Sequence, residues 1–128
     1  ITNDWNTPGM TTNPRYKFCQ GDQVCPTFWA CFIADFGKDW DVIIDDGGHF
    51  NDQIITTFNA LWPVVKPGGF YAVEDLGVDC PGSIFVKPGF LSHTGFLHAL
   101  NAEMNIGLTG IDSIHQLKEL AILRKATA

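Results

Sequence analysis

The sequence predicts an α/β fold in which parallel strands alternate with helices. Two short apolar runs, at 41–45 and 70–73, are rich in β-branched or aromatic residues and are bounded by turn residues. Between them, apolar side chains recur at helical spacing from Ile54 to Val65. A helix joining two strands makes a βαβ unit, so these strands should be parallel neighbours.

The length and composition indicate one folded domain. The 128 residues are 45% hydrophobic and 17% charged, which favours a globular chain over a disordered one. No apolar run reaches the roughly 18–20 residues that a membrane span needs. The 14 acidic and 8 basic residues give a net charge of −6, which argues against a nucleic-acid or anionic-membrane surface. We therefore expect a cytoplasmic small-molecule enzyme or cation-binding protein, with a homo-oligomer left open.

The first third of the chain should hold a leader, a strand and a helix. Residues 1–14 are rich in Thr, Asn, Pro and Gly and predict an irregular leader before a domain at 15–128. Residues 15–20 alternate weakly and predict a short strand. Pro26 should open a helix that ends at Gly37 and has an apolar face of Phe28, Trp29, Phe32, Ile33 and Phe36. The apolar pattern of this helix predicts a buried, reduced thiol at Cys31; disulfides among the four cysteines are the less favoured alternative.

The βαβ unit follows. The run at 41–45 reads as a strand buried on both faces. Asn51 or Asp52 should cap the next helix, and the Pro-Gly-Gly at 67–69 should separate it from the strand at 70–73.

The last third should end in a hairpin. Residues 77–90 hold three Gly and two Pro and predict a loop, and 94–104 predict a helix. The strands expected at 111–117 and 120–125 have so short a link that they should be antiparallel.

Acidic residues follow both strands of the βαβ unit. Asp45 and Asp46 close the first, and Glu74 and Asp75 close the second. Ligands of open α/β sheets bind beyond the carboxyl ends of the strands. Grouped carboxylates repel one another unless protons or a cation neutralise them, and oxygen ligands suit Mg²⁺ or Mn²⁺. The alternative is that each acid only caps a loop or a helix.

Other side chains near these acids could contribute. His49 follows Asp46 across two glycines, and its ordinary pKa of about 6.5 suits a general base. Asp22 lies after the first expected strand, where contact with an exocyclic amine and a turn cap are about equally favoured. The other three histidines are expected to be surface or packing residues, and Lys87 a solvated loop charge.

The stretch from Asp41 to Asp75 resembles class I S-adenosylmethionine-dependent methyltransferases. More narrowly, it is similar to the metal-dependent O-methyltransferases that act on sugars of macrolide antibiotics. The likeness rests on D-D-G-G-H at 45–49, P-G-G at 67–69 and a strand ending in E-D at 74–75. The G-D-Q at 21–23 and the closing strands extend it.

The resemblance implies a Rossmann-like sheet of parallel strands with helices on both faces and a carboxyl-terminal antiparallel hairpin. It implies Mg²⁺ held by Asp46, Glu74 and Asp75, with Asp46 also counted as catalytic. His49 would be the base on a small-molecule hydroxyl acceptor, for example of a sugar. Asp22, Gln23 and Asp45 would contact S-adenosylmethionine, Asp22 on its adenine side.

The family's first strand and Gly-rich cofactor loop are not visible in residues 1–20. We therefore expect 15–128 to be the carboxyl-terminal portion of such a domain, with the earlier strands missing. The alternative is a non-catalytic binding module of the same fold.

Overall fold

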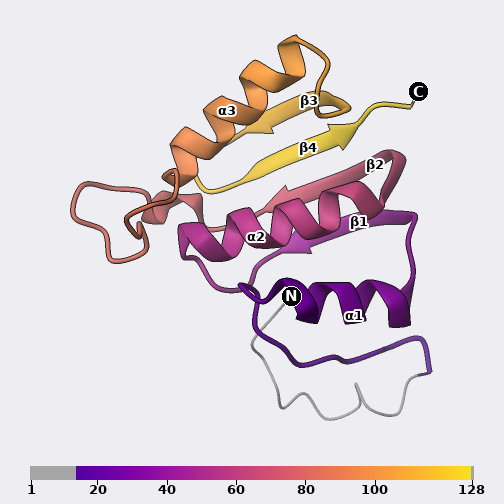
Figure 1. Cartoon of the computed structure of the whole chain (residues 1–128). Coiled ribbons are helices and arrows are strands. Elements are labelled where there is room, and N and C mark those ends of the chain that lie inside the picture. Colours follow the sequence, from indigo (N-terminus) through magenta and orange to yellow (C-terminus); the bar gives the residue numbers. More distant parts are fainter. Residues whose placement is uncertain (1–13, 128) are drawn as a thin grey trace.

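Four strands form one mixed sheet in the order β1-β2-β4-β3 (Figure 1). The structure is a computed structural model and describes residues 14–127. The strands are β1 (Trp40–Asp45), β2 (Val65–Val73), β3 (Ile111–Gln116) and β4 (Ala121–Lys125). β1 and β2 are parallel, whereas β4 runs antiparallel to both β2 and β3. The predicted βαβ unit and closing hairpin are confirmed.

Three helices accompany the sheet: α1 (Pro26–Phe36), α2 (Asn51–Leu61) and α3 (His93–Asn105). Short 3₁₀ turns lie at Trp62–Val64 and Leu76–Val78. The helix at 26–36 begins and ends where the sequence predicted, with Pro26 in its first turn. Its C-cap is Gly37, whose φ of 89° is a conformation that favours glycine.

All three helices lie on the same side of the sheet (Figure 1). α2 packs against α1 on one flank and α3 on the other. Phe58 of α2 joins these layers, with ring centroids 5.2 Å from Tyr71 of β2 and 5.3 Å from Phe96 of α3. Phe58, Tyr71 and Leu123 of β4 are all buried, so the core lies between this face and the helices.

The other face of the sheet carries no helix from residues 14–127. Side chains alternate along a strand, so Val42 and Ile44 of β1 and Phe70 of β2 point to that face. They are 52%, 48% and 41% exposed. The prediction that β1 is buried on both faces is therefore wrong for the described part of the chain. Apolar residues occupy consecutive positions of β1, so the sequence does not show that one face of the strand is more exposed than the other.

Several further predictions need correction. Residues 15–20 form no strand, because Tyr16 and Phe18 are both more than half exposed and burial does not favour one face. The Pro-Gly-Gly at 67–69 lies inside β2 instead of before it, and a register shift between β1 and β2 accommodates it. Cys31 is exposed, although all four thiols are free. Apart from Pro14, the predicted leader lies outside the described residues.

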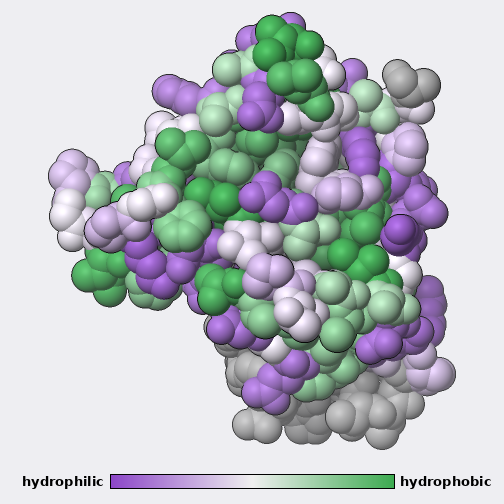
Figure 2. Space-filling view, in the orientation of Figure 1, coloured by the Kyte–Doolittle hydropathy of each residue, from purple (hydrophilic) through white to green (hydrophobic). Residues whose placement is uncertain are grey.

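The surface over the helices mixes polar and apolar residues (Figure 2). An apolar group near the end of α3 stands out in that view. Ile106 and Leu108, which follow α3, are 70% and 73% exposed. Within residues 14–127, no helix combines the length and apolarity required to cross a membrane.

Candidate active site

The register of β1 and β2 brings their acidic ends to one edge of the sheet. Asp45 pairs with Val73, and the Glu74 amide donates to the Asp45 carbonyl over 3.1 Å. Asp46 and Glu74 therefore leave adjacent parallel strands at the same level. This is the carboxyl edge at which open α/β sheets bind ligands.

His49 reaches the end of β2. Its Nε2 lies 3.3 Å from Oδ2 of Asp75, and the two side chains are 29% and 54% exposed. The Phe85 ring lies beside the imidazole, 6.3 Å away between centroids. Asp75 has a φ of 55°, a left-handed conformation uncommon outside glycine. Such backbone conformations are found preferentially at functional sites.

The turn after β2 is held by the link between β3 and β4. Glu119 accepts from the Leu76 amide through its carbonyl and from the Gly77 amide through Oε2, over 3.2 and 2.9 Å. A Cβ at Gly77 would lie 2.1 Å from that carboxylate oxygen. These contacts fix the backbone immediately after Asp75.

The predicted metal ligands share an edge but do not converge. Within residues 14–127, no three His, Cys, Asp or Glu side chains lie close enough together to hold an ion. Asp46, Glu74 and Asp75 nevertheless supply carboxylate oxygens on adjacent strand ends, which are the ligands that Mg²⁺ takes. The donor set fits a hard divalent cation, and Asp75 is turned toward His49 instead.

Gln23 is the centre of a buried polar network below this edge. Its Nε2 donates to Asp45 Oδ1 over 3.0 Å and to Thr57 Oγ1 over 3.1 Å. Its Oε1 accepts from the Gly48 amide, and its carbonyl accepts from the Trp29 indole over 2.8 Å. Gln23 thus connects the segment before α1 to the loop between β1 and α2. Its predicted cofactor contact stays a prediction, since both ends of the side chain have protein partners.

Asp45 lies in the same network and is 2% exposed. Burial raises the pKa of its carboxyl to about 6, against the opposing effect of the Gln23 hydrogen bond. Tyr71 also donates to Asp45, over 3.4 Å, and burial raises the tyrosine's pKa well above its ordinary value. The Asp45 side chain is packed behind the site, so its predicted cofactor contact also stays a prediction.

The paired glycines allow two glutamines to approach the loop. A Cβ at Gly47 would lie 2.5 Å from Gln23 Oε1, and one at Gly48 would lie 2.0 Å from Gln53 Oε1. Gln53 also accepts from the Phe50 amide and closes the first turn of α2. The two glycines between Asp46 and His49 are therefore needed for packing, because a side chain at either position would collide with a glutamine.

The remaining predicted residues have mixed outcomes. Asp22 is exposed, and its carboxylate accepts from the Val24 amide over 3.1 Å, as in a turn. This contact leaves the predicted adenine contact untested. Lys87 was expected to be solvated, but its ammonium lies 2.8 Å from Asp52 and 4.6 Å from the Phe50 ring centroid. The helical spacing predicted α2 but not which loop packs against its first turn.

Two buried polar residues near the site carry no local sequence signal. Asn51 is 1% exposed and bonds to the loop that ends before α3. His93 is 2% exposed and contacts the His49 carbonyl. Both partners are more than 30 residues away in sequence, so periodicity does not reveal them.

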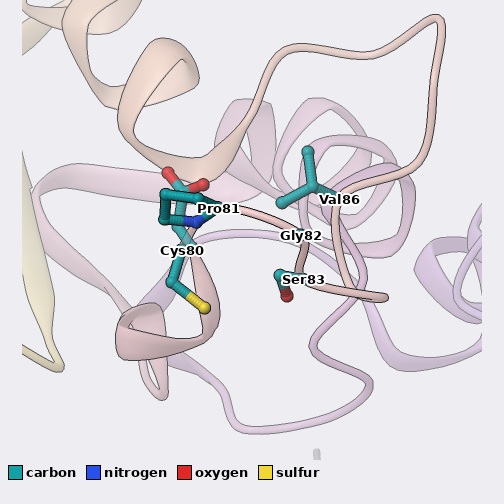
Figure 3. A pocket seen from close by; sticks show the side chains of 6 residues that line it. Cys80, Pro81, Gly82, Ser83 and Val86 are labelled. Atoms are coloured by element: carbon teal, nitrogen blue, oxygen red, sulfur yellow. The ribbon is translucent and has the colours of Figure 1, made fainter.

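An open hollow lies in the loop between β2 and α3 (Figure 3). It is lined by Asp79, Cys80, Pro81, Gly82, Ser83 and Val86. Asp79 is also bonded to the start of α3, through the Thr94 amide at 2.7 Å. Phe85, whose ring lies beside His49, is part of the same loop as the residues that line the hollow.

No family model matches the sequence. Curated relatives each match about half of this chain. Demethylmacrocin O-methyltransferase of Streptomyces fradiae is 46% identical over 56 residues, which are 44% of this chain and 14% of the relative. Mycinamicin VI 2''-O-methyltransferase of Micromonospora griseorubida is 42% identical over 62 residues, 48% of this chain and 15% of the relative. A tetracenomycin-C rhamnosyl 2'-O-methyltransferase of Streptomyces olivaceus is 50% identical over 63 residues, 49% and 16% of the two chains.

Solved structures match nearly the whole chain. MycE methyltransferase from the mycinamycin biosynthetic pathway, in complex with Mg, SAH and mycinamycin VI, has a TM-score of 0.76 and 30% identity. The match covers 89% of this chain and 32% of that one. A second crystal of MycE with Mg and SAH gives a TM-score of 0.73 and 31% identity. The chain therefore spans about a third of the length of these structures and about a sixth of the curated relatives.

Proposed function

We propose that this chain is the carboxyl-terminal portion of a class I methyltransferase domain, similar to the sugar O-methyltransferases, and that it contributes to methyl transfer onto a hydroxyl group. The observation that carries the proposal is the His49–Asp75 pair at the carboxyl edge of parallel β1 and β2. The names of the relatives favour this reading over a non-catalytic module of the same fold.

The acceptor would be a small molecule with neighbouring hydroxyls, such as a sugar. The relatives' names describe methylation of macrolides or of sugars on tetracenomycin. When bound, Mg²⁺ would supply a Lewis acid for the acceptor oxygen, and S-adenosylmethionine would supply the methyl group. Asp46, Glu74 and Asp75 would hold the ion, and Asp22 would face the adenine side of the cofactor.

His49 would take the proton of the acceptor hydroxyl, which frees an oxygen lone pair for attack. Its side chain is 29% exposed, so it is partly open to solvent. The carboxylate of Asp75 stabilises the positive charge that the ring gains. A carboxylate has two oxygens, so Asp75 could serve His49 through one and an ion through the other.

Two polar side chains, the buried Gln23 and the exposed Glu119, would orient these groups. Gln23 holds the loop that carries Asp46 and His49, and Glu119 holds the turn after Asp75. Fixed side chains let the reacting groups meet without reorganisation, which is a large part of enzymatic rate enhancement.

Calorimetric titration with S-adenosylhomocysteine tests the proposal. It would be done with Mg²⁺ and with EDTA, on this chain and on any longer form that its gene encodes. We expect binding by at least one form, and methyl transfer to a sugar hydroxyl by that form only with Mg²⁺. A complete lack of binding by every form would refute the methyltransferase assignment.

A further inference from the structure

His93 is a buried histidine that contacts the loop between β1 and α2, which carries His49. It is the first residue of α3 and is 2% exposed. Its Nε2 lies 2.8 Å from the backbone carbonyl oxygen of His49. The two histidines are 44 residues apart, so the contact joins α3 to the loop before α2.

The chemistry of this contact fixes the donor. A carbonyl oxygen only accepts hydrogen bonds, so Nε2 of His93 carries the proton and donates it. The second nitrogen, Nδ1, is buried without a hydrogen-bond partner among the described residues. An apolar side chain would fill the same space without leaving that atom unpaired. What histidine adds at this position is therefore the single N–H donor aimed at His49.

Hydrogen bonds hold the loop that leads into His93. Asn51 ties the start of α2 to the loop that leads into α3, with Nδ2 donating to the Lys87 and Leu91 carbonyls over 3.1 Å each. Its Oδ1 accepts from the Lys87 amide over 2.9 Å, and its own amide donates to the Phe85 carbonyl over 3.0 Å. The start of α2 is thus held to the loop that ends just before α3. The His93 bond adds the backbone of His49 to the same frame.

We propose that His93 is a positioning residue whose Nε2–H holds the main chain at His49 and so sets the place of the His49 ring relative to Asp75. This inference rests on the proposed role of His49 as the base. His93 itself touches no reacting atom, because its ring is buried and its donor is used by the carbonyl.

Three variants of the full chain test the proposal. His93→Gln keeps an N–H donor at similar reach, His93→Met keeps similar volume without a donor, and His98→Met is a matched control on the exposed face of α3. Amide hydrogen exchange at Gly48 and Phe50 is measured without metal or cofactor. We expect about fivefold faster exchange in His93→Met, the effect of losing one hydrogen bond, and near-normal exchange in the other two.

A second measurement does not depend on a substitution. In a long-range ¹H–¹⁵N spectrum of the native chain, the proton of His93 should reside on Nε2. A proton on Nδ1 alone would overturn the proposal, as would equal exchange rates in His93→Gln and His93→Met.

A kinetic measurement adds a third readout. If the native protein transfers methyl groups, His93→Met should lower kcat with little change in KM, and His93→Gln should keep kcat near the native value. Lack of turnover in the native protein would count against the proposed function and would leave the exchange result standing.

Discussion

Nε2 of His49 lies 3.3 Å from Oδ2 of Asp75. The imidazole comes from the loop after β1, and the carboxylate comes from the turn after the neighbouring strand, β2. The partners are 26 residues apart, and the parallel register of β1 and β2 brings them together. A carboxylate at this distance can accept a hydrogen bond from the ring and so orient it.

Replacing the histidine should separate chemistry from binding. In a form that transfers methyl groups, His49→Ala should lower kcat by about 10²–10⁴-fold, the usual contribution of a positioned base. The affinity for S-adenosylhomocysteine, measured by calorimetry, should stay nearly unchanged. His98→Ala, on the exposed face of α3, is the control. A large loss of cofactor affinity in His49→Ala would mean that the residue is structural.

The acidic strand ends should determine divalent-ion affinity. Asp46→Asn and Glu74→Gln each remove an anionic ligand, so each should weaken Mg²⁺ binding by more than the roughly 10–100-fold that loss of an outer-shell partner produces. Isothermal titration with MgCl₂ measures this. Asp35→Asn on exposed α1 removes one charge far from the strand ends and serves as the control. Unchanged affinity in both site variants would place the ion elsewhere.

The two glycines of the loop should differ in their tolerance of alanine. The side chain facing Gly47 is Gln23, which is buried and held by Asp45 and Thr57, so it cannot move away easily. Gly47→Ala should lower the free energy of unfolding by about 1–3 kcal/mol, as overpacking does. Gly48→Ala meets the end of Gln53, which is less buried and can rotate, so its effect should be smaller. Urea denaturation measures both, and the reverse order would contradict this account.

Stability should fall as the buried Asp45 ionises. Its pKa is about 6 in the folded chain, against about 3.9 in an unfolded one. The folded state therefore binds the proton more tightly. This contribution to stability is complete below about pH 4 and is lost as the pH rises through about 6, at about 1.4 kcal/mol per pKa unit. Asp45→Asn should flatten the pH dependence between 4 and 7, measured by denaturation in EDTA. An unchanged slope in the variant would assign the effect to other groups.

The local patterns predicted the core of the fold well. The β-branched run at 41–45, the apolar stripe of α2 and the short link before β4 each depend on neighbouring residues, so the sequence reveals them directly. The placement of the acidic residues at one edge of the sheet could also be predicted, because parallel strands have their carboxyl ends at the same edge.

The contacts that depend on distant residues could not be predicted. Gln23 meets Asp45 and Thr57 across 22 and 34 residues, and His93 meets His49 across 44. No periodicity links such positions, and a polar residue looks the same in the sequence whether it is buried or exposed. The prediction of a strand at 15–20 was wrong for a related reason. Weak alternation of apolar and polar residues does not show whether another part of the chain will cover the apolar side.

The strand order has a consequence for how the chain assembles. β4 is the last strand in the sequence but lies between β2 and β3, so it contributes hydrogen bonds to both. During synthesis, β1, α2 and β2 are made before β4, so one edge of β2 stays open until β4 has been made. A growing chain thus carries an exposed hydrogen-bonding edge while residues 74–120 are added, and such edges attract other chains. Chaperone demand during translation should therefore be set by the arrival of 121–125.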